Sequence, residues 1–214
     1  MPHERNDVRR AYDRIADDYL AERNGSDEES EDIALLAEFH GHLPDDARVL
    51  DAGCGAGRPI AELLATHTNL VGVDFSREQV ARARENVPEG QFCQADMTAL
   101  GLTDEAFDGI CAYHSVIHVP TDEHPDVASE FYRLLRPGGH LLLTVGSTAW
   151  EGSNDDWLGT GVEMHWSVPS PDESVTTLEN AGFDVLWRQT VNDVLGGDTC
   201  FVLARKLDPE DYNQ

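Results

Sequence analysis

Short apolar runs alternate with amphipathic segments through the middle of the chain. Each run is bounded by polar or glycine-containing residues, which is typical of buried strands, and most are followed by residues with helical spacing. The apolar runs read RVLDAG, NLVGVDF, GQFCQAD, FDGICAY and HLLLTVG, and the predicted helices cover residues 58–66, 77–86 and 124–135. Strands that alternate with helices in this way predict a mostly parallel sheet with helices on both faces.

Two further helices are predicted ahead of the first strand. Residues 5–23 carry an apolar stripe formed by Ala11, Ile15, Ala16 and Tyr19. After the polar stretch NGSDEES, Ser30 is suited to cap a second helix, whose apolar positions are Ile33, Leu35, Leu36 and Phe39. We expect residues 1–43 to form an N-terminal helical cap.

Two serines have the spacing of helix capping boxes. Ser76 is followed by Gln79, and Ser170 is followed by Glu173, so a helix is expected to start after each serine. The second of these helices ends at Ala181-Gly182. The strand-like runs FDVLWRQTV and DTCFVLARK follow, joined by the turn-rich NDVLGGD, and we expect them to pair antiparallel.

Residues 147–169 follow neither the helical nor the strand period. Trp150, Trp157, Met164 and Trp166 stand there among glycine, serine and aspartate. Two interpretations remain open at this point. The tryptophans form a small satellite core packed on the sheet, or they form an apolar lid that recognises a substrate and excludes water.

The charge balance is strongly acidic. The 214 residues contain 41 acidic and 15 basic side chains, for a formal net charge of −26, and Lys206 is the one lysine. The length suits one domain over residues 1–214. A nucleic-acid-binding groove needs clustered basic side chains, so we exclude a nucleic-acid partner. Acid-rich, lysine-poor composition resembles cytosolic proteins of salt-loving archaea, although an acidic partner-binding surface is the alternative.

The cysteines and the apolar runs exclude other classes. Cys54, Cys93, Cys111 and Cys200 form no C-x-x-C pair, so neither a zinc site nor a disulfide framework is expected. Three of them fall in strand-like stretches, where a free thiol behaves as a small hydrophobic side chain. The charged N-terminus does not resemble a signal peptide, and no apolar run approaches the roughly 20 residues that cross a bilayer. We expect a cytoplasmic protein with no membrane partner.

A glycine-rich loop directly follows the first predicted strand. In RVLDAGCGAG, Asp51 precedes Gly53, Gly55 and Gly57, and glycine permits positive φ and close approach of backbone to a ligand. A dinucleotide-binding loop would place a glycine where Arg58 stands. Two acids end the following strands, Asp74 at a position suited to ribose hydroxyls and Asp96, with Met97 beside it, at one suited to an adenine.

With these motifs, the chain resembles the class I S-adenosylmethionine-dependent methyltransferases, especially their small-molecule branch (the type 11 and type 25 methyltransferases). VLDAGCGAGR, VGVDFS and CQADM are similar to the family's glycine, ribose and adenine motifs. FDGICAYHSVIHVP and FYRLLRPGGHLLLTV resemble its later strand motifs, and AYDRIADDY resembles its cofactor-capping helix. The resemblance covers residues 10–206. It implies a Rossmann-like three-layer α/β sandwich, with N-terminal capping helices and a mostly parallel seven-stranded sheet that includes an antiparallel C-terminal strand.

The resemblance also implies a cofactor and a set of contacts to it. S-adenosylmethionine would lie with its methionine part against the glycine loop, and Asp51 would either orient that loop or meet the cofactor's ammonium group, directly or through water. Residues 147–169 would cover a small-molecule acceptor. The implied cofactor contacts are Tyr12, Tyr19, Asp51, Gly53, Cys54, Gly55, Gly57, Asp74, Phe75, Asp96, Met97 and Tyr113, and the implied acceptor contacts are Trp157, His165 and Trp166.

Two histidines follow the fourth predicted strand, where the transferred methyl would point. Methyl transfer needs the nucleophile, carbon and sulfur in line, so proximity alone can suffice. A general base helps only where the acceptor must lose a proton. His114 is the first candidate base. His118 belongs to a family element and is interpreted mainly as structural, and His165 is a weaker candidate.

Two other function classes remain as alternatives. A nicotinamide-dependent oxidoreductase would need a catalytic Tyr/Lys or similar pair, which Lys206 does not supply. A non-catalytic S-adenosylmethionine-binding or regulatory module would have a degraded cofactor loop or a blocked acceptor cavity, whereas every cofactor motif here is intact.

Overall fold

One seven-stranded sheet forms the centre of the molecule. The computed structural model describes residues 5–23, 31–193 and 197–208. The sheet has the order β3-β2-β1-β4-β5-β9-β8, and β9 runs antiparallel to both of its neighbours while the other strands are parallel. This confirms the predicted sheet and the antiparallel C-terminal pair. The strands are β1 (Arg48–Ala52), β2 (Asn69–Asp74), β3 (Gln91–Gln94), β4 (Phe107–Ala112), β5 (Leu135–Gly146), β8 (Phe183–Asp193) and β9 (Gly197–Lys206).

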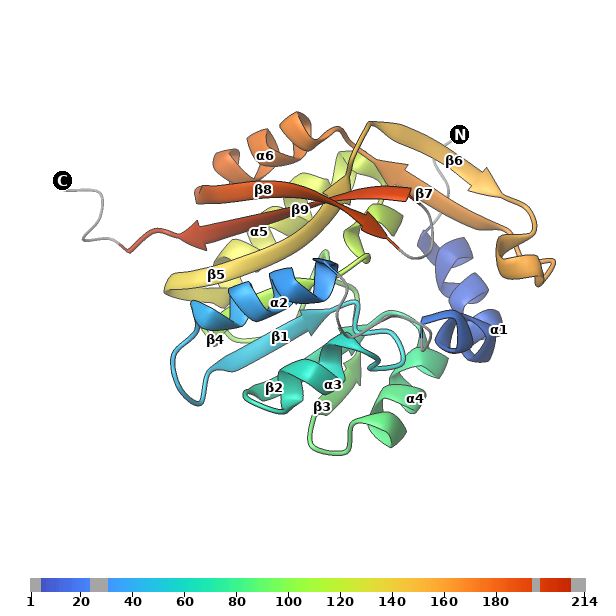
Figure 1. Ribbon diagram of the computed structural model, residues 1–214, viewed down its shortest axis with the longest axis horizontal. Helices are drawn as coiled ribbons and strands as arrows, with labels where there is room; N and C mark the ends of the chain where they lie inside the picture. The colour runs from blue at the N-terminus through green and yellow to red at the C-terminus, as the bar shows by residue number, and fades with distance from the viewer. Residues whose placement is uncertain (1–4, 24–30, 194–196, 209–214) are drawn as a thin grey trace.

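Helices cover both faces of this sheet, as the alternating pattern predicts (Figure 1). α2 (Glu31–Gly41), α3 (Ile60–Ala65) and α4 (Arg77–Asn86) share one apolar core with it, and α5 (His124–Leu134) and α6 (Pro171–Asn180) share the other. Neighbouring strand residues face opposite cores: Val49 belongs to the first and Leu50 to the second. Strands buried on both faces explain the continuous apolar runs in the sequence.

The two predicted capping boxes differ in the structure. Ser170 accepts from the backbone of Glu173, whose carboxylate accepts in return from the backbone of Ser170, so α6 begins with a complete capping box. Ser76 also caps α4 by accepting from the Gln79 backbone. The N–H of Ser76, however, donates to Asp74, so the side chain of Gln79 is left for another role.

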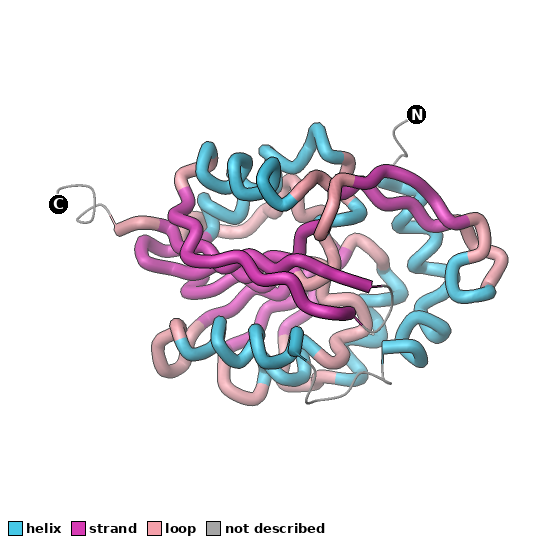
Figure 2. Tube along the Cα trace, turned by 45° about the horizontal axis from the view of Figure 1, so that its top comes forward, coloured by secondary structure: helices cyan, strands magenta, loops and turns pink. Residues whose placement is uncertain are grey.

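A smaller unit lies at the carboxyl ends of the parallel strands. Residues 147–169 contain a β-hairpin formed by β6 (Trp150–Asn154) and β7 (Met164–Val168), which lies beside α1 (Arg5–Arg23) (Figure 2). Apolar side chains of both elements form a third core, and Trp157 and Trp166 pack on it. The hairpin is a correction to the irregular segment expected from the sequence.

The structure also bears on the expected N-terminal cap and on the expected burial of Cys93. α2 packs on the sheet beside β5 and β8, so α1 is the part of the expected N-terminal cap that reaches the carboxyl ends. Cys93 is exposed, which corrects its interpretation as a small buried hydrophobic residue. The expected cap Ser30 lies outside the described residues.

Within the described ranges, no helix is long and apolar enough to span a bilayer.

Candidate functional site

The loop after β1 is shaped by close contacts of its glycines with the rest of the protein. Gly53 has φ +87°, and a Cβ there would lie 2.2 Å from the Cβ of Ser115. Gly57 has φ +86°, and its Cβ would lie 3.0 Å from Val87 and 3.3 Å from the backbone of Ala83. Both positions need glycine for backbone conformation and for close packing, Gly53 against the loop after β4 and Gly57 against α4 and the residue that follows it.

Gly55 differs from its two neighbours because it faces open space. Its φ is +50°, and the nearest atom to a Cβ built there is the Gln79 amide oxygen at 4.0 Å. Of the three glycines in the motif, Gly55 is therefore the one that leaves room for a ligand. Gly57 lies under α4 and lines none of the cavities described below, so a direct contact from it to a cofactor stays a prediction.

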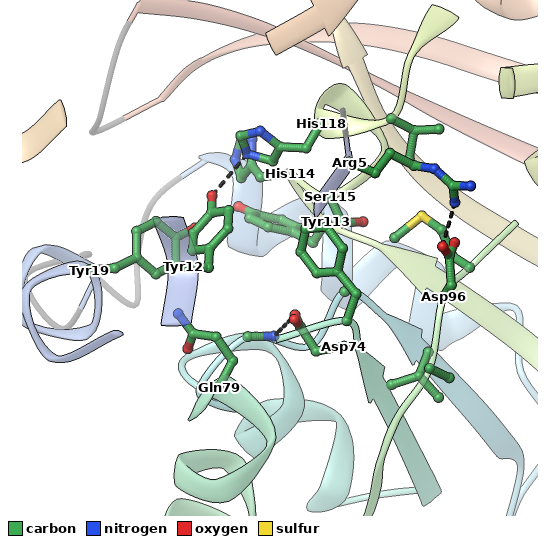
Figure 3. Close-up of a pocket in the computed structure, with 17 residues that line it drawn as sticks. Arg5, Tyr12, Tyr19, Asp74, Gln79, Asp96, Tyr113, His114, Ser115 and His118 are labelled. Carbon is green, nitrogen blue, oxygen red and sulfur yellow. Dashed lines mark hydrogen bonds and ion pairs between the residues drawn. The ribbon is translucent and has the colours of Figure 1, made fainter. Parts of the chain in front are cut away.

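Asp74, at the end of β2, holds the glycine loop in place. One carboxylate oxygen accepts from the backbone N–H of Gly55 (3.0 Å), and the other accepts from that of Ser76 (2.8 Å), as Figure 3 shows for Gly55. Burial raises the pKa of Asp74 to about 6, against the lowering effect of these two hydrogen bonds. A carboxylate has about four acceptor positions, so two remain for a ligand.

Asp51, at the end of β1, lies beneath the same loop. Its carboxyl group is 1 % exposed, and among the described residues its Oδ2 has no hydrogen-bond partner. Burial, together with the nearby Asp74, raises the pKa of Asp51 to about 8. Burial also raises the pKa of the neighbouring Cys54 thiol, so this cysteine stays neutral beside the loop. Asp51 is thus suited to a cationic partner that stabilises its charged form.

Asp96 follows β3 and is paired with the first residue of α1. The guanidinium of Arg5 donates to Asp96 and to Thr98 (2.8 Å) and forms an ion pair with Glu123 (3.0 Å). Figure 3 shows Arg5 reaching Asp96 across the edge of the cavity. Met97, the next residue, and Phe75, which follows β2, are apolar side chains that line the same cavity as Asp96. The acid predicted to bind an adenine therefore lies at the cavity, and a cation already contacts it.

His114 occupies an unusual backbone position after β4. Its φ is +50°, a conformation that non-glycine residues rarely adopt, and the residue is 9 % exposed. Its ring packs edge-on against Tyr113 and Phe201, with ring centres 4.6 and 5.9 Å apart. The Tyr113 hydroxyl donates to Asp32 on α2. Residues with such backbone strain cluster at functional sites.

His118 links α1 to the hairpin. Its Nδ1 lies 2.9 Å from the carbonyl oxygen of His165, and its Nε2 lies 2.9 Å from the hydroxyl of Tyr12. A carbonyl oxygen only accepts, so Nδ1 carries the proton, and in the neutral ring Nε2 accepts from Tyr12. His165 thus enters the site through its backbone. Its own ring lies 3.5 Å from Glu163 and lines none of the described cavities.

Three adjoining cavities open among these residues. The strand-end cavity lies over Asp74, Phe75, Asp96, Met97 and Tyr113. The glycine-loop cavity lies over Asp51, Gly53, Cys54, Gly55 and Tyr113. The hairpin cavity lies between α1, the loop after β4 and the hairpin, and its walls include Tyr12, Ile117, Trp150, Trp157 and Trp166. Two described residues, Tyr19 and His114, line all three cavities.

Three residues of the site were missed by sequence reasoning. Arg5 reaches Asp96 from the far end of the chain, and no local pattern marks it. Ser115, which lines the strand-end cavity, donates to the carbonyl of Ala52 (2.6 Å) and packs against Gly53. Gln79 also lines that cavity, and both its amide atoms are buried without a partner among the described residues. The Ser76–Gln79 spacing drew attention to Gln79, but for helix capping.

The sequence matches a known domain family and curated relatives. Residues 50–143 match the family described as a methyltransferase domain. The chain is 35 % identical over 152 residues to methyltransferase GfsG of Streptomyces halstedii, covering 65 % of this chain and 53 % of that protein. It is 29 % identical over 165 residues to the sterol 24-C-methyltransferase erg6 of Aspergillus fumigatus, covering 71 % and 43 %. The chain thus spans about half the length of these relatives.

Solved structures share the fold. A SAM-dependent methyltransferase from Methanosarcina mazei has a TM-score of 0.71 at 20 % identity, over 80 % of this chain and 97 % of that one. The [4+2]-cyclase SpnF has a TM-score of 0.73 at 19 % identity, over 94 % and 95 %. Residues 50–143 thus match the methyltransferase domain family, and the chain shares its fold with solved S-adenosylmethionine-dependent methyltransferase structures.

Proposed function

We propose that the protein transfers the methyl group of S-adenosylmethionine to a small-molecule acceptor. The observation that carries this proposal is the meeting of the three cavities at Tyr19 and His114. Two cavities lie over the loop and strand ends that bind nucleosides in open parallel sheets. The third opens between α1 and the hairpin. A cofactor in the strand-end and glycine-loop cavities and an acceptor in the hairpin cavity would therefore meet at Tyr19 and His114.

The residues at the first two cavities fit this cofactor. The buried Asp51 suits the ammonium group of the methionine part, and Gly55 leaves open space beside it. Asp74 keeps acceptor positions for ribose hydroxyls, and Gln79 offers an unpartnered amide in the same cavity. Met97 and Phe75 would flank the adenine ring, and Asp96 would accept from its amino group, sharing that carboxylate with Arg5.

The cofactor, when bound, supplies a methyl group that is already activated by the sulfonium. The protein then has to align the acceptor and exclude water. α1 and the hairpin cover the site, with Tyr12 and His118 joining them. His114 lies where the cavities meet and would accept a proton from an acceptor that must lose one. In this proposal His118 positions the covering elements.

Two alternatives make different predictions. Since [4+2]-cyclase SpnF has the same fold, the fold alone does not fix the reaction. A non-catalytic binding module would bind the cofactor without turnover. An NAD-dependent oxidoreductase would prefer NAD, yet Arg58 stands where a dinucleotide loop needs its third glycine.

The test has two stages. Calorimetry should show binding of S-adenosylmethionine and S-adenosylhomocysteine and no preference for NAD. Incubation with methyl-labelled cofactor and a metabolite extract should then transfer label and release S-adenosylhomocysteine. Preference for NAD would refute the proposal. Binding without transfer to any extract would favour the non-catalytic module.

The composition supports a proposed environment as well. We propose that the protein works in the cytoplasm of a cell that accumulates salt, since −26 charges on 214 residues repel one another until they are screened. The same charge disfavours nucleic acid and anionic membrane surfaces as partners.

A further inference from the structure

The walls of the hairpin cavity have an unusual chemical character. Five aromatic residues line it from α1 and the hairpin region: Tyr12, Tyr19, Trp150, Trp157 and Trp166. They form two groups of packed rings, a tryptophan group and a tyrosine pair, and the His118 ring lies between them, with its centre 5.3 Å from that of Tyr12 and 5.8 Å from that of Trp166. The Trp157 and Trp166 ring centres are 4.8 Å apart at 76°, those of Trp150 and Trp166 are 5.7 Å apart, and those of Tyr12 and Tyr19 are 5.2 Å apart at 81°. All five side chains line the same cavity, so a bound molecule would have aromatic rings on both the α1 side and the hairpin side.

The charged groups at this cavity all have one sign. Asp155 and Asp156 line it at the tip of the hairpin, and no lysine or arginine is among its described lining residues. Both are exposed, and Asp156 also accepts from the backbone of Gly161 (2.6 Å) and so holds the tip. Aromatic faces attract cations through the ring quadrupole, and carboxylates at the entrance add to this attraction. A carboxylate or phosphate would find no lysine or arginine to pair with among the described lining residues.

From this combination we infer that the acceptor of the proposed methyl transfer is an amine, held in the hairpin cavity as its ammonium form. This rests on the proposed function, because it names the substrate class of that site. A neutral acceptor would gain from the aromatic area alone, and an anionic acceptor would be repelled. The cavity has a volume of about 760 Å³, which suits a small molecule.

His114 is placed to accept the proton that an ammonium substrate must lose before methyl transfer. An ammonium ion must first lose a proton to expose its nitrogen lone pair, and His114 lies where the hairpin cavity meets the other two. The nitrogen lone pair then forms the new N–C bond, while the C–S bond breaks and leaves its electron pair on sulfur. If the methylated product of a primary or secondary amine then releases a further proton, water accepts it, because His114 already holds the first.

The inference can be tested by binding alone, without turnover. Three of the four tryptophans line the hairpin cavity and the fourth, Trp187, lies on β8, so tryptophan fluorescence reports on this cavity. The probes are choline, its neutral isostere 3,3-dimethylbutan-1-ol and the anion 3,3-dimethylbutanoate, each titrated with S-adenosylhomocysteine present. We expect choline to bind about tenfold more tightly than the alcohol, as several cation–π contacts would give. The choline affinity should fall as KCl is raised, and the alcohol affinity should not.

Matched variants separate charge from structure. Asp155→Asn should weaken choline about threefold and leave the alcohol unchanged, as loss of one screened charge pair predicts. Glu89→Gln, which removes the same charge from the exposed turn after α4, should change neither. Trp150 is 49 % exposed, so Trp150→Ala should fold normally yet weaken choline, whereas Leu186→Ala at a similarly exposed position on β8 should not.

Each contrary outcome has a distinct meaning. If the alcohol or the carboxylate binds as tightly as choline, or if no probe changes the fluorescence, the amine inference is overturned. An Asp155→Asn effect no larger than that of Glu89→Gln would overturn it as well. Calorimetry with S-adenosylhomocysteine is run on the same samples. Failure of that ligand to bind refutes the proposed function itself, whereas its binding without preference for choline refutes only the substrate class.

Discussion

The hydroxyl of Tyr12 on α1 lies 2.9 Å from Nε2 of His118 in the loop after β4. The other ring nitrogen of His118 contacts the carbonyl oxygen of His165 on β7, also at 2.9 Å. One imidazole thus connects three elements that are far apart in sequence and that cover the candidate site. This arrangement gives His118 a positioning role and leaves His114 as the histidine at the junction of the cavities.

Tyr12→Phe tests this link. The variant keeps the ring in the third core but removes the donor to His118, so we expect a loss of about 1 to 2 kcal/mol of stability. Chemical denaturation measures the stability, and calorimetry should show weaker binding of S-adenosylhomocysteine because α1 is held less firmly. Tyr132→Phe, on a ring that packs against Phe183 away from the site, is the control for the ligand effect. Equal ligand affinities in wild type and Tyr12→Phe would contradict the positioning role.

Asp74→Ala tests the ribose contact. Loss of a charged acceptor that binds hydroxyls should weaken S-adenosylhomocysteine about 10- to 100-fold, corresponding to roughly 1.5–3 kcal/mol. Asp74→Asn should have a smaller effect, because its amide oxygen can still accept from the Gly55 backbone. Asp45→Asn, at an exposed position before β1, controls for lost charge. Calorimetry in molar KCl gives the affinities. An unchanged affinity in Asp74→Ala would remove this residue from the cofactor site.

Sequence patterns predicted the sheet well because its central strands, such as β1 and β4, are buried on both faces and therefore carry continuous apolar runs. The hairpin could not be found in this way. Its strands are half exposed and do not alternate strictly between apolar and polar residues. Trp166 packs on the core that the hairpin shares with α1, and Trp150 packs on Trp166. Arg5 was missed for a related reason, since its contact with Asp96 exists only once α1 docks.

The glycine loop shows the same limit at the level of single residues. The spacing of Gly53, Gly55 and Gly57 predicted a ligand loop, but it could not distinguish glycines required by packing from one that leaves open space. That distinction depends on Ser115 and α4, which contact Gly53 and Gly57 and leave Gly55 clear. The acids Asp51 and Asp74 were found because strand ends are marked in the sequence.

The buried Asp51 makes stability depend on pH. Its pKa is about 8 in the folded protein and near 3.8 in an unfolded chain, so between these values the folded state holds a proton that the unfolded state has released. Its contribution to stability is therefore full below about pH 4, falls as pH rises, and levels off above about pH 8. Asp51→Asn cannot ionise. The unfolding free energy of wild type minus that of Asp51→Asn should decline from pH 5 to pH 8.

Calorimetry gives a second measurement of the same group. A cation near Asp51 lowers its pKa, so S-adenosylhomocysteine should release a proton at pH 7.5, and the binding heat should vary with the ionisation enthalpy of the buffer. Asp51→Asn should show a smaller variation. If the unfolding free energy of wild type minus that of Asp51→Asn does not change with pH, Asp51 ionises normally in the folded protein.

The net charge of −26 predicts that salt stabilises the fold. The Debye length shrinks from roughly 10 Å at 0.1 M to roughly 3 Å at 1 M, so added KCl screens repulsion between neighbouring carboxylates. The melting temperature should rise steadily from about 0.1 M to molar KCl. Ion pairs such as Arg82–Asp17 weaken over the same range, but they are few beside 41 acidic residues. A melting temperature independent of KCl would refute the proposed salt-rich environment.

His114→Asn is the most informative change for the mechanism. Asparagine tolerates the left-handed backbone found at His114, with φ +50°, whereas alanine would add strain, so Asn removes the imidazole with the least disturbance. If alignment dominates, turnover of an amine acceptor should fall less than about tenfold, and the pH profile should follow the ionisation of the amine itself. Unchanged affinity for S-adenosylhomocysteine would show that the cofactor cavities are intact. We expect this smaller loss, because the proton can leave to water as well as to the histidine. A loss of roughly 10²- to 10⁴-fold, with the inflection near neutral pH removed, would instead identify His114 as the general base.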